Sequence, residues 1–213
     1  RCTSPAGWYS DSMKVFALTV AEGVVRERFL TPEGTRAKRQ IPVGAFLLEH
    51  PAGRVLVDAG PPPVQRVLLR AIRSVRAGRF SASSQGLPQQ LARHGVPPET
   101  IAHIVLTHLH WDHVQGLPFF VAGDRPDAEV DFYVPAQNAR TGRDLLAAAM
   151  APPNFPITPE GLQGKWTFTA LEAGYHQIAG FRVRATEVKH KGGRTFGYRV
   201  SDDSGSIAYL PDH

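Results

Sequence analysis

Apolar and polar residues alternate along the first sixty residues in a way that is typical of β-strands. The alternation covers residues 14–20, 44–49 and 54–58, and the short turn HPAG between the last two predicts a hairpin. The sequence DAGPPP then ends the sheet. Residues 64–77 and 87–94 have the spacing of amphipathic helices, and residues 104–107 form an apolar run typical of a buried strand.

The second half of the chain repeats this mixture of strands and helices. Residues 130–134 predict a strand, and the alanine- and leucine-rich residues 136–150 predict a helix. The segment APPNFPITPEGLQG is a long irregular connection, which is typical of the rim of a functional site. The four segments KWTFTALEA, HQIAGFRVRATEVKH, RTFGYRVSD and GSIAYLPDH predict a four-strand meander. The order of elements predicts an α+β sandwich with helices outside.

Composition limits the class of protein. The chain has 213 residues, of which 42% are apolar and 20% charged, so we expect one globular domain. We place that domain at residues 13–213, because Met13 opens the first strand, and we expect residues 1–12 to be an N-terminal extension or tag. The single cysteine, Cys2, excludes an intrachain disulfide and a thiolate metal site. A reducing compartment, the cytoplasm, is therefore expected, and no apolar run approaches the length of a membrane span.

The net charge of +5 favours anionic ligands at long range. Nucleic acid is compatible with this charge, but nothing in the sequence indicates it. The densest basic segment places arginines at three- and four-residue spacing along residues 66–76, between apolar positions. This pattern is typical of the solvated face of a helix, and an anionic partner is the alternative.

The candidate chemistry is concentrated in the segment THLHWDHVQGLPFF. His108 and His110 follow the buried strand, and in an extended segment they point to the same side. A turn at Trp111 brings Asp112 and His113 to a second position nearby. Four potential ligands within six residues therefore predict a site for two metals.

Three further candidate positions follow strands elsewhere in the chain. Asp58 follows VLV in the segment VLVDAG, His190 precedes a glycine pair in EVKHKGG, and Asp212 and His213 follow AYLP. Each alone is typical of a solvated strand end or a turn. Beside the clustered ligands, they become candidates for the same site.

Together these motifs resemble the metallo-β-lactamase superfamily, whose fold is a four-layer αββα sandwich. The resemblance extends over nearly the whole chain from about Val15. The segments LTHLHWDHVQGLPFF, APPNFPI and HKGGRTFGYRV are most similar to the phosphodiesterase-type branch. That branch includes tRNA 3′-processing endonucleases and the carbon-phosphorus-lyase-associated cyclic phosphodiesterase.

The resemblance implies a two-metal site and a role for each candidate residue. One metal is held by His108, His110 and His190, and the other by Asp112 and His113, with Asp212 bridging them. Asp112 and Asp212 are the expected catalytic carboxylates around a metal-bound hydroxide. Asp58 is expected to orient a ligand imidazole through a hydrogen bond. Zinc suits three neutral histidines, and the carboxylates also accept manganese or iron.

The sequence departs from the family pattern in two places. The family usually supplies one more histidine beyond the bridging aspartate, whereas this chain ends at His213, so either the chain is truncated or the second metal site is incomplete. The branch commonly has a proline where this chain has Lys191, which could bind phosphate or be an exposed lysine beside a turn. Trp111 and Phe155 are further candidates for substrate contact, with core packing as the alternative for aromatic residues here.

The sequence favours phosphodiester hydrolysis over two alternatives. The first half also resembles acyl-homoserine lactonases, but those chains usually carry PGHTPGH where this one has KHKGGRTFGYR. Hydrolysis of a lactone or carboxylic ester is therefore the second hypothesis, and a non-catalytic metal- or ligand-binding domain is the third. The expected partner is a small phosphodiester or ester, and the oligomeric state is left open.

Overall fold

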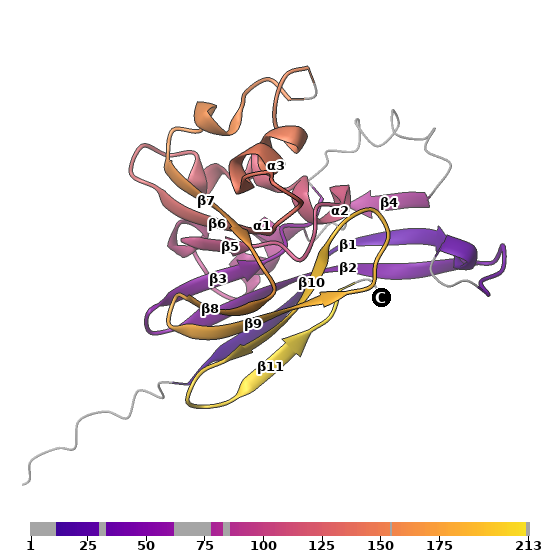
Figure 1. The fold of residues 1–213 in the computed structure, drawn as a ribbon, viewed down its shortest axis with the longest axis horizontal. Coiled ribbons are helices and arrows are strands. Elements are labelled where there is room, and N and C mark those ends of the chain that lie inside the picture. The colour runs from indigo at the N-terminus through magenta and orange to yellow at the C-terminus, as the bar shows by residue number, and fades with distance from the viewer. Residues whose placement is uncertain (1–11, 30–32, 62–77, 83–85, 154, 212–213) are drawn as a thin grey trace, which may run out of the picture.

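The structure is a computed structural model that describes residues 12–29, 33–61, 78–82, 86–153 and 155–211 (Figure 1). Three expectations fall outside these ranges: the N-terminal extension, the basic helix at residues 64–77, and the ligand role of Asp212 together with its neighbour His213. The described chain forms two sheets and a set of short helices.

The larger sheet has seven strands in the order β4-β1-β2-β3-β5-β6-β7. Its first four strands pair antiparallel, whereas β3, β5, β6 and β7 run parallel. The strands are β1 (Lys14–Arg26), β2 (Lys38–His50), β3 (Gly53–Val57), β4 (Gly78–Ala82), β5 (His103–Val105), β6 (Glu129–Pro135) and β7 (Lys165–Leu171).

The smaller sheet is an antiparallel meander in the order β11-β10-β9-β8. Its strands are β8 (Gly174–Ile178), β9 (Phe181–Val188), β10 (Thr195–Ser201) and β11 (Ser206–Tyr209).

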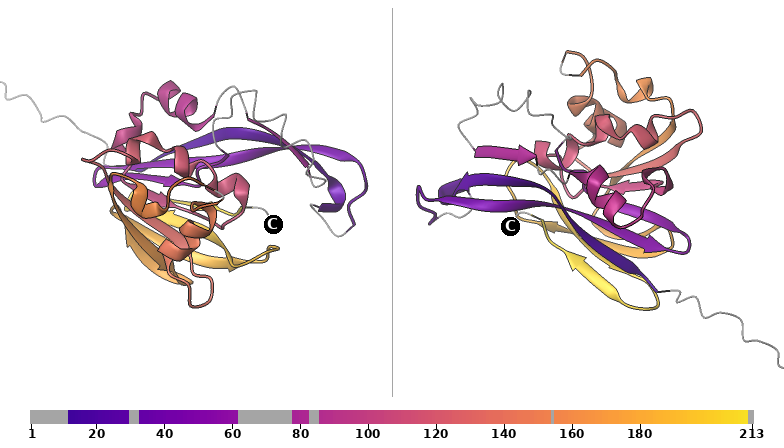
Figure 2. Two further views of the ribbon diagram at one scale, coloured as in Figure 1. Left: turned by 90° about the horizontal axis from the view of Figure 1, so that it is seen from above. Right: turned by 180° about the vertical axis from the view of Figure 1, so that it is seen from behind.

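The three α-helices in the described residues are short, and they lie near the larger sheet (Figures 1 and 2). They are α1 (Leu87–Arg93), α2 (Trp111–Val114) and α3 (Gly142–Ala149), and the 3₁₀ helices are Glu27–Phe29, Pro98–Thr100, Leu117–Phe119, Val121–Gly123 and Pro159–Gly161. Side chains of α1, α2 and α3 share one buried cluster with the larger sheet, whereas the second buried cluster joins the two sheets.

Alternation along the central strands separates these two cores. In β2, Leu47 packs into the cluster on the helix side, and its neighbour Leu48 packs between the sheets. In β3, Leu56 faces the helices while Val55 and Val57 face the smaller sheet. Successive side chains of a strand point to opposite faces, so these strands are apolar on both sides.

The predicted α+β sandwich is confirmed, and in the described residues three of its layers are present: helices, larger sheet and smaller sheet. The predicted hairpin is β2–β3, with Glu49 paired to Arg54. Strands β1 and β2 are each longer than predicted, because their far ends form a ribbon in which most of residues 36–42 are exposed. This part of β2 has no apolar alternation from which a strand could be predicted.

Two expectations about the second half were wrong. The segment KWTFTALEA is strand β7, which leaves the expected meander and pairs parallel with β6, while HQIAGFRVRATEVKH contributes to two strands, β8 and β9. The helix expected at residues 136–150 begins only at Gly142. Thr141 caps it, because its side chain accepts a hydrogen bond from the Asp144 backbone N–H, and the preceding residues form a tight turn.

We expect the core on the helix side to carry much of the stability. Phe132 in β6 is fully buried there and contacts Phe168. Phe132→Ala should lower the free energy of unfolding by about 3–5 kcal/mol, measured by urea denaturation. Tyr175→Ala, which truncates an aromatic ring that is 77% exposed, is the control and should change it by less than about 0.5 kcal/mol. Equal losses in the two variants would contradict this account of the core.

Candidate metal centre

The candidate ligands come together where strands end. Asp58 directly follows β3, and Thr107 and His108 follow β5 by two and three residues. Because β3 and β5 are parallel neighbours, their carboxyl ends meet at the same edge of the sheet. His190 arrives at this edge from the other sheet, two residues after β9.

Three imidazoles form the centre of the site. The ring nitrogens of His108, His110 and His190 that could bind a cation all lie within 4.8 Å of one another. The ring centroids of these three residues, which we call the imidazole cluster, are 4.5–4.9 Å apart. His108 is buried, and the other two are partly exposed, so one side of the cluster opens to solvent.

The spacing within the imidazole cluster fits a metal ion. Nε2 of His190 and Nδ1 of His110 lie 3.1 Å apart. Two nitrogens bound to one tetrahedral zinc ion are separated by about 3.3 Å, given a zinc to nitrogen distance of about 2.05 Å. The donor set is thus suited to a divalent cation of borderline softness.

The absence of a side chain at Gly192 leaves room for the imidazole of His110. Gly192 has φ of +92°, and a Cβ built on it would lie 2.8 Å from Nε2 of His110. Any side chain there would collide with the imidazole cluster and would also strain the backbone. The glycine pair after His190 is therefore required by close packing.

Asp112 and His113 lie at a second position beside the imidazole cluster. Helix α2 begins directly after His110, whose backbone carbonyl accepts a hydrogen bond from the His113 N–H. Nε2 of His113 is 3.7 Å from Oδ2 of Asp112, and the His113 ring centroid is 4.1 Å from that of His108. The turn predicted at Trp111 is present, and the second metal position stays a prediction because Asp212 is outside the described residues.

Asp58 is a fully buried carboxylate at the base of the site. Its Oδ1 accepts a hydrogen bond from the Thr107 N–H at 2.8 Å, and its Oδ2 accepts one from the Thr107 hydroxyl, also at 2.8 Å. Nδ1 of His113 lies 2.9 Å from Oδ2. A carboxylate can only accept, so this geometry assigns the proton to Nδ1 of His113 and the lone pair to Nε2.

Thr107 extends the same arrangement to His108. The Thr107 hydroxyl has one hydrogen, which it donates to Asp58, so its oxygen accepts from Nδ1 of His108 at 3.1 Å. The lone pair of His108 is then on Nε2, as a metal ligand requires. Sequence analysis missed Thr107, although it stands directly before the first histidine of the motif.

Strand β10 of the smaller sheet holds the segment that carries Thr107 and His108. The Tyr198 hydroxyl in β10 donates to the Leu106 carbonyl at 2.8 Å, and the Phe196 N–H donates to the Thr107 carbonyl at 2.9 Å. Burial, followed by the negative charge of Asp58, raises the pKa of Tyr198 well above its ordinary value. Tyr198 therefore stays a neutral donor and holds the segment that carries His108.

A cavity of about 370 Å³ adjoins the imidazole cluster. Beside His108 and His110, it is lined by the turn after β6 and by the loop before β10, namely Gln137, Asn138, Arg140, Gly192, Gly193, Arg194 and Thr195, with Leu109 and Leu145. Its lining is mixed in polarity and includes two arginines, Arg140 and Arg194. Sequence analysis did not predict that the turn after β6 lines the cavity. Its position at the carboxyl end of a parallel strand could have indicated this.

None of the three candidate substrate residues, Trp111, Lys191 and Phe155, is among the lining residues of this cavity. Trp111 is 68% exposed in the first turn of α2. Lys191 is exposed in the loop after His190. Phe155 is half-buried, and its ring packs edge-on against Phe119 with centroids 5.8 Å apart. Their contact with substrate stays a prediction.

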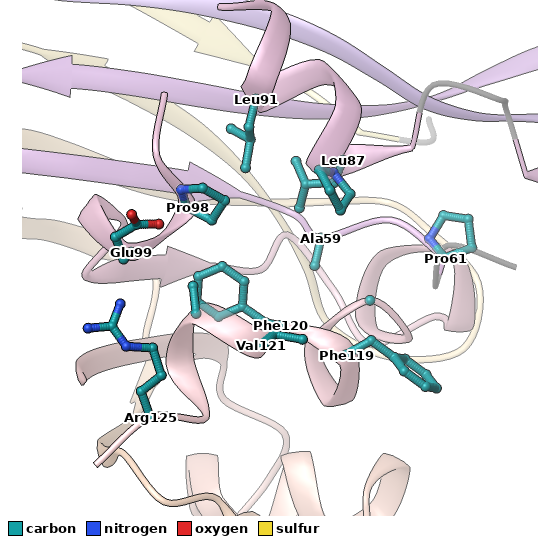
Figure 3. A pocket seen from close by; sticks show the side chains of 13 residues that line it. Ala59, Pro61, Leu87, Leu91, Pro98, Glu99, Phe119, Phe120, Val121 and Arg125 are labelled. Carbon is teal, nitrogen blue, oxygen red and sulfur yellow. The ribbon is translucent and has the colours of Figure 1, made fainter. Parts of the chain in front are cut away.

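A second cavity of about 390 Å³ lies on the helix side of Asp58 (Figure 3). Apolar residues from α1 and from the segment 116–122 form most of its wall, and Glu99 and Arg125 stand at one side of it. Ala59 and Gly116 are part of its lining, so it backs onto the strand end that carries Asp58. It contains none of the candidate metal ligands.

Comparison with known proteins identifies the family. A β-lactamase superfamily domain matches residues 53–213, which include the imidazole cluster and Asp58. The chain belongs to the metallo-β-lactamase superfamily. The resemblance inferred from the motif is thereby confirmed for three quarters of the chain.

Curated relatives in this superfamily have different activities. Ribonuclease Z of Nocardia farcinica is 30% identical over 144 residues, which cover 66% of this chain and 45% of that protein. N-acyl homoserine lactonase AiiB of Agrobacterium fabrum is 31% identical over 120 residues, which cover 50% of this chain and 44% of that protein. The chain spans less than half the length of either relative.

Solved structures share the metallo-β-lactamase fold. A mutant of AiiA from B. thuringiensis with N-decanoyl-L-homoserine bound at its active site aligns with a TM-score of 0.63, covering 91% of this chain and 73% of that one. Its sequence is 19% identical, so the likeness concerns the fold. In this chain, none of the described helices is long and apolar enough to cross a membrane.

We expect the buried carboxylate to control metal affinity. Asp58→Asn should weaken zinc binding by about 10- to 100-fold, because the amide cannot accept from all three donors that the carboxylate serves. Zinc affinity would be measured by competition with a chromophoric chelator. Asp127→Asn, which changes an exposed carboxylate, should bind zinc like the wild type, and an unchanged affinity in Asp58→Asn would argue against this role.

We expect the effect of Thr107 on zinc affinity to come from its hydroxyl and not from the volume of its side chain. Thr107→Val keeps the shape but removes the group that links Asp58 to His108, so zinc affinity should fall by about 10-fold. Thr107→Ser retains the hydroxyl and should restore most of the affinity. Thr186→Val, on the exposed face of β9, is the matched control. Equal affinities in the valine and serine variants would show that the hydroxyl has no part in metal binding.

Proposed function

We propose that this member of the superfamily is a metal-dependent phosphodiesterase centred on the imidazole cluster. The observation that carries the proposal is that three imidazole nitrogens that could bind a cation lie within 4.8 Å of one another, beside a cavity lined by two arginines. A phosphodiester is negatively charged, and guanidinium groups bind phosphate oxygens well. The similarity to ribonuclease Z over 144 residues supports the same substrate class.

The proposed ligand assignment follows the sequence motif. His108, His110 and His190 would hold one divalent cation, and Asp112 and His113 a second, with Asp212 bridging. Zinc suits the imidazoles, and manganese or iron would also be accepted where carboxylates contribute. Bound cations would polarise the phosphoryl group and activate water as the nucleophile.

The protein groups around this centre would orient the imidazoles, exclude water from the leaving group and accept a proton. Asp58 and Thr107 keep the lone pairs of His113 and His108 on Nε2, directed away from the buried base. Asp112 is partly exposed beside His113 and would accept a proton from the attacking water. Trp111 would cover the leaving group with its exposed ring, with Phe155 further out along the rim and Lys191 offering a cation.

Hydrolysis of a neutral lactone or ester is the second candidate function. It is favoured by the 31% identity to AiiB over 120 residues and by the common fold with AiiA. The exposed Trp111 ring would suit an acyl chain as well as an aromatic leaving group. The two functions differ in the charge of the substrate, which makes them separable by experiment.

His110→Ala provides the direct test of the proposed centre. Purified wild-type protein should contain zinc or manganese and should hydrolyse bis-p-nitrophenyl phosphate faster than an acyl-homoserine lactone. The variant should lose about one metal ion per chain together with this hydrolysis, because the first site loses a ligand. Elemental analysis and absorbance at the nitrophenolate band measure the two quantities.

The control is His176→Ala, which removes an imidazole bonded to the Glu172 carbonyl in the smaller sheet. It should keep both metal and activity. Full metal content in His110→Ala would contradict the ligand assignment, and lactone turnover without phosphodiester turnover in the wild type would favour the second function.

A further inference from the structure

Two arginines line the cavity beside the imidazole cluster, and their guanidinium groups differ in what they contact. Arg194 lies in the loop before β10, and Arg140 lies in the turn after β6. A cation that binds substrate must keep N–H donors and net charge available for it. The contacts of the two side chains show which of them does.

Arg194 is committed to protein carboxylates. Its Nη1 lies 2.8 Å from Oε2 of Glu172, and its Nε lies 3.2 Å from Oε2 of Glu187. Nη1 also donates to the Ala136 carbonyl, and the guanidinium stands 5.1 Å from the centroid of the Phe196 ring. The hydrogen bond that Arg194 donates to Glu172 is the main reason that the pKa of Arg194 is raised. Two acidic partners offset its charge toward the cavity.

Arg140 has no carboxylate within ion-pair distance among the residues that the structure describes. Its Nη2 donates to the backbone carbonyl of Asp144 at 2.9 Å, which satisfies one donor without neutralising charge. The Asp144 carboxylate is engaged elsewhere, since it accepts from the Thr141 hydroxyl at 2.7 Å and lies 3.3 Å from Nη1 of Arg143. The remaining donors of Arg140 are thus directed to the cavity or to solvent.

The turn that carries Arg140 is fixed on both sides. Gln137 donates to the Arg194 carbonyl at 2.8 Å and accepts from the Arg194 N–H at 3.0 Å, which ties the turn to the loop of the imidazole cluster. Asn138 has φ of +57°, and the Arg140 N–H donates to the Gln137 carbonyl. Thr141 then caps α3. A guanidinium on so constrained a turn loses little freedom when it binds an anion.

We propose that Arg140 is the specificity-determining residue that binds the anionic oxygen of the substrate and thereby favours phosphodiesters over neutral esters. This inference rests on the proposed function and names the group that would select its substrate class. Arg140 would donate two N–H groups to phosphate oxygens, a geometry that a lysine ammonium cannot reproduce. A neutral lactone offers no such charge, so its hydrolysis would not need Arg140.

Inorganic phosphate serves as the probe for a binding test. Isothermal titration of the metal-loaded protein would compare the wild type with Arg140→Ala, Arg140→Lys and the control Arg199→Ala. Arg199 is exposed on β10, donates to Ser206 and does not line the cavity. Arg140→Ala should raise the Kd for phosphate by about 10- to 100-fold, and Arg140→Lys should restore only part of the affinity. Arg199→Ala should leave it unchanged.

Turnover of a charged and a neutral substrate then shows whether Arg140→Ala removes an anion contact or disturbs the structure of the site. Arg140→Ala should lower kcat/KM for bis-p-nitrophenyl phosphate by a similar factor and leave that for neutral p-nitrophenyl acetate unchanged, with metal content as in the wild type. An unchanged Kd for phosphate in Arg140→Ala, absence of phosphate binding in the wild type, or equal loss with both substrates would overturn the inference. Phosphate binding that depends on Arg140, without phosphodiester turnover by the wild type, would support the anion site and reject the proposed function.

Discussion

A buried negative charge organises this structure. Asp58 has no exposed surface, and its carboxylate is satisfied only if the Thr107 N–H, the Thr107 hydroxyl and His113 all converge on it. Leaving a buried polar group without its hydrogen-bond partner typically costs about 1–3 kcal/mol, and more for a charged group, because neither water nor another donor replaces that partner. The ends of β3 and β5 and the start of α2 are therefore held in one arrangement. Asp58 itself adopts φ of +60°, a conformation that aspartate tolerates better than most residues.

The same constraint orients the imidazole of His113 directly and that of His108 through Thr107. The imidazole cluster also needs His110 and His190. His108 and His110 come from the larger sheet, whereas His190 comes from the loop between β9 and β10. Backbone bonding between Phe196 and Thr107, and the Gln137 clamp on Arg194, join that loop to the larger sheet. The imidazole cluster thus depends on the packing of the two sheets. The proposed ligand set suits phosphodiesters and carboxylic esters alike, and the proposal places the selection between them at the cavity wall.

Local patterns in the sequence were sufficient for the elements nearest the site. The alternation in β2 and β3 and the turn HPAG depend on neighbouring residues, and both predicted the hairpin that the structure contains. The H-x-H-x-D-H spacing likewise predicted that His108 and His110 lie together before a turn at Trp111, whereas the two-metal site stays a prediction. The parallel pairing of β7 with β6 was not predictable in this way, since an alternating strand fits either sheet. The late start of α3 depends on Gln137 bonding to Arg194, 57 residues away, which helix propensity does not register. Thr107 and Arg140 were missed because their roles come from tertiary contacts.

The central claim is that His108, His110 and His190 together form a metal site, in which Asp58 orients His108 through Thr107. Anomalous diffraction at the zinc absorption edge, from crystals of the wild-type chain grown with one equivalent of zinc, tests this directly. The account predicts an anomalous peak about 2.0–2.1 Å from one nitrogen of each of the three imidazoles. A strong peak bound only by Asp112 and His113, or zinc held solely at other surface histidines, would contradict it.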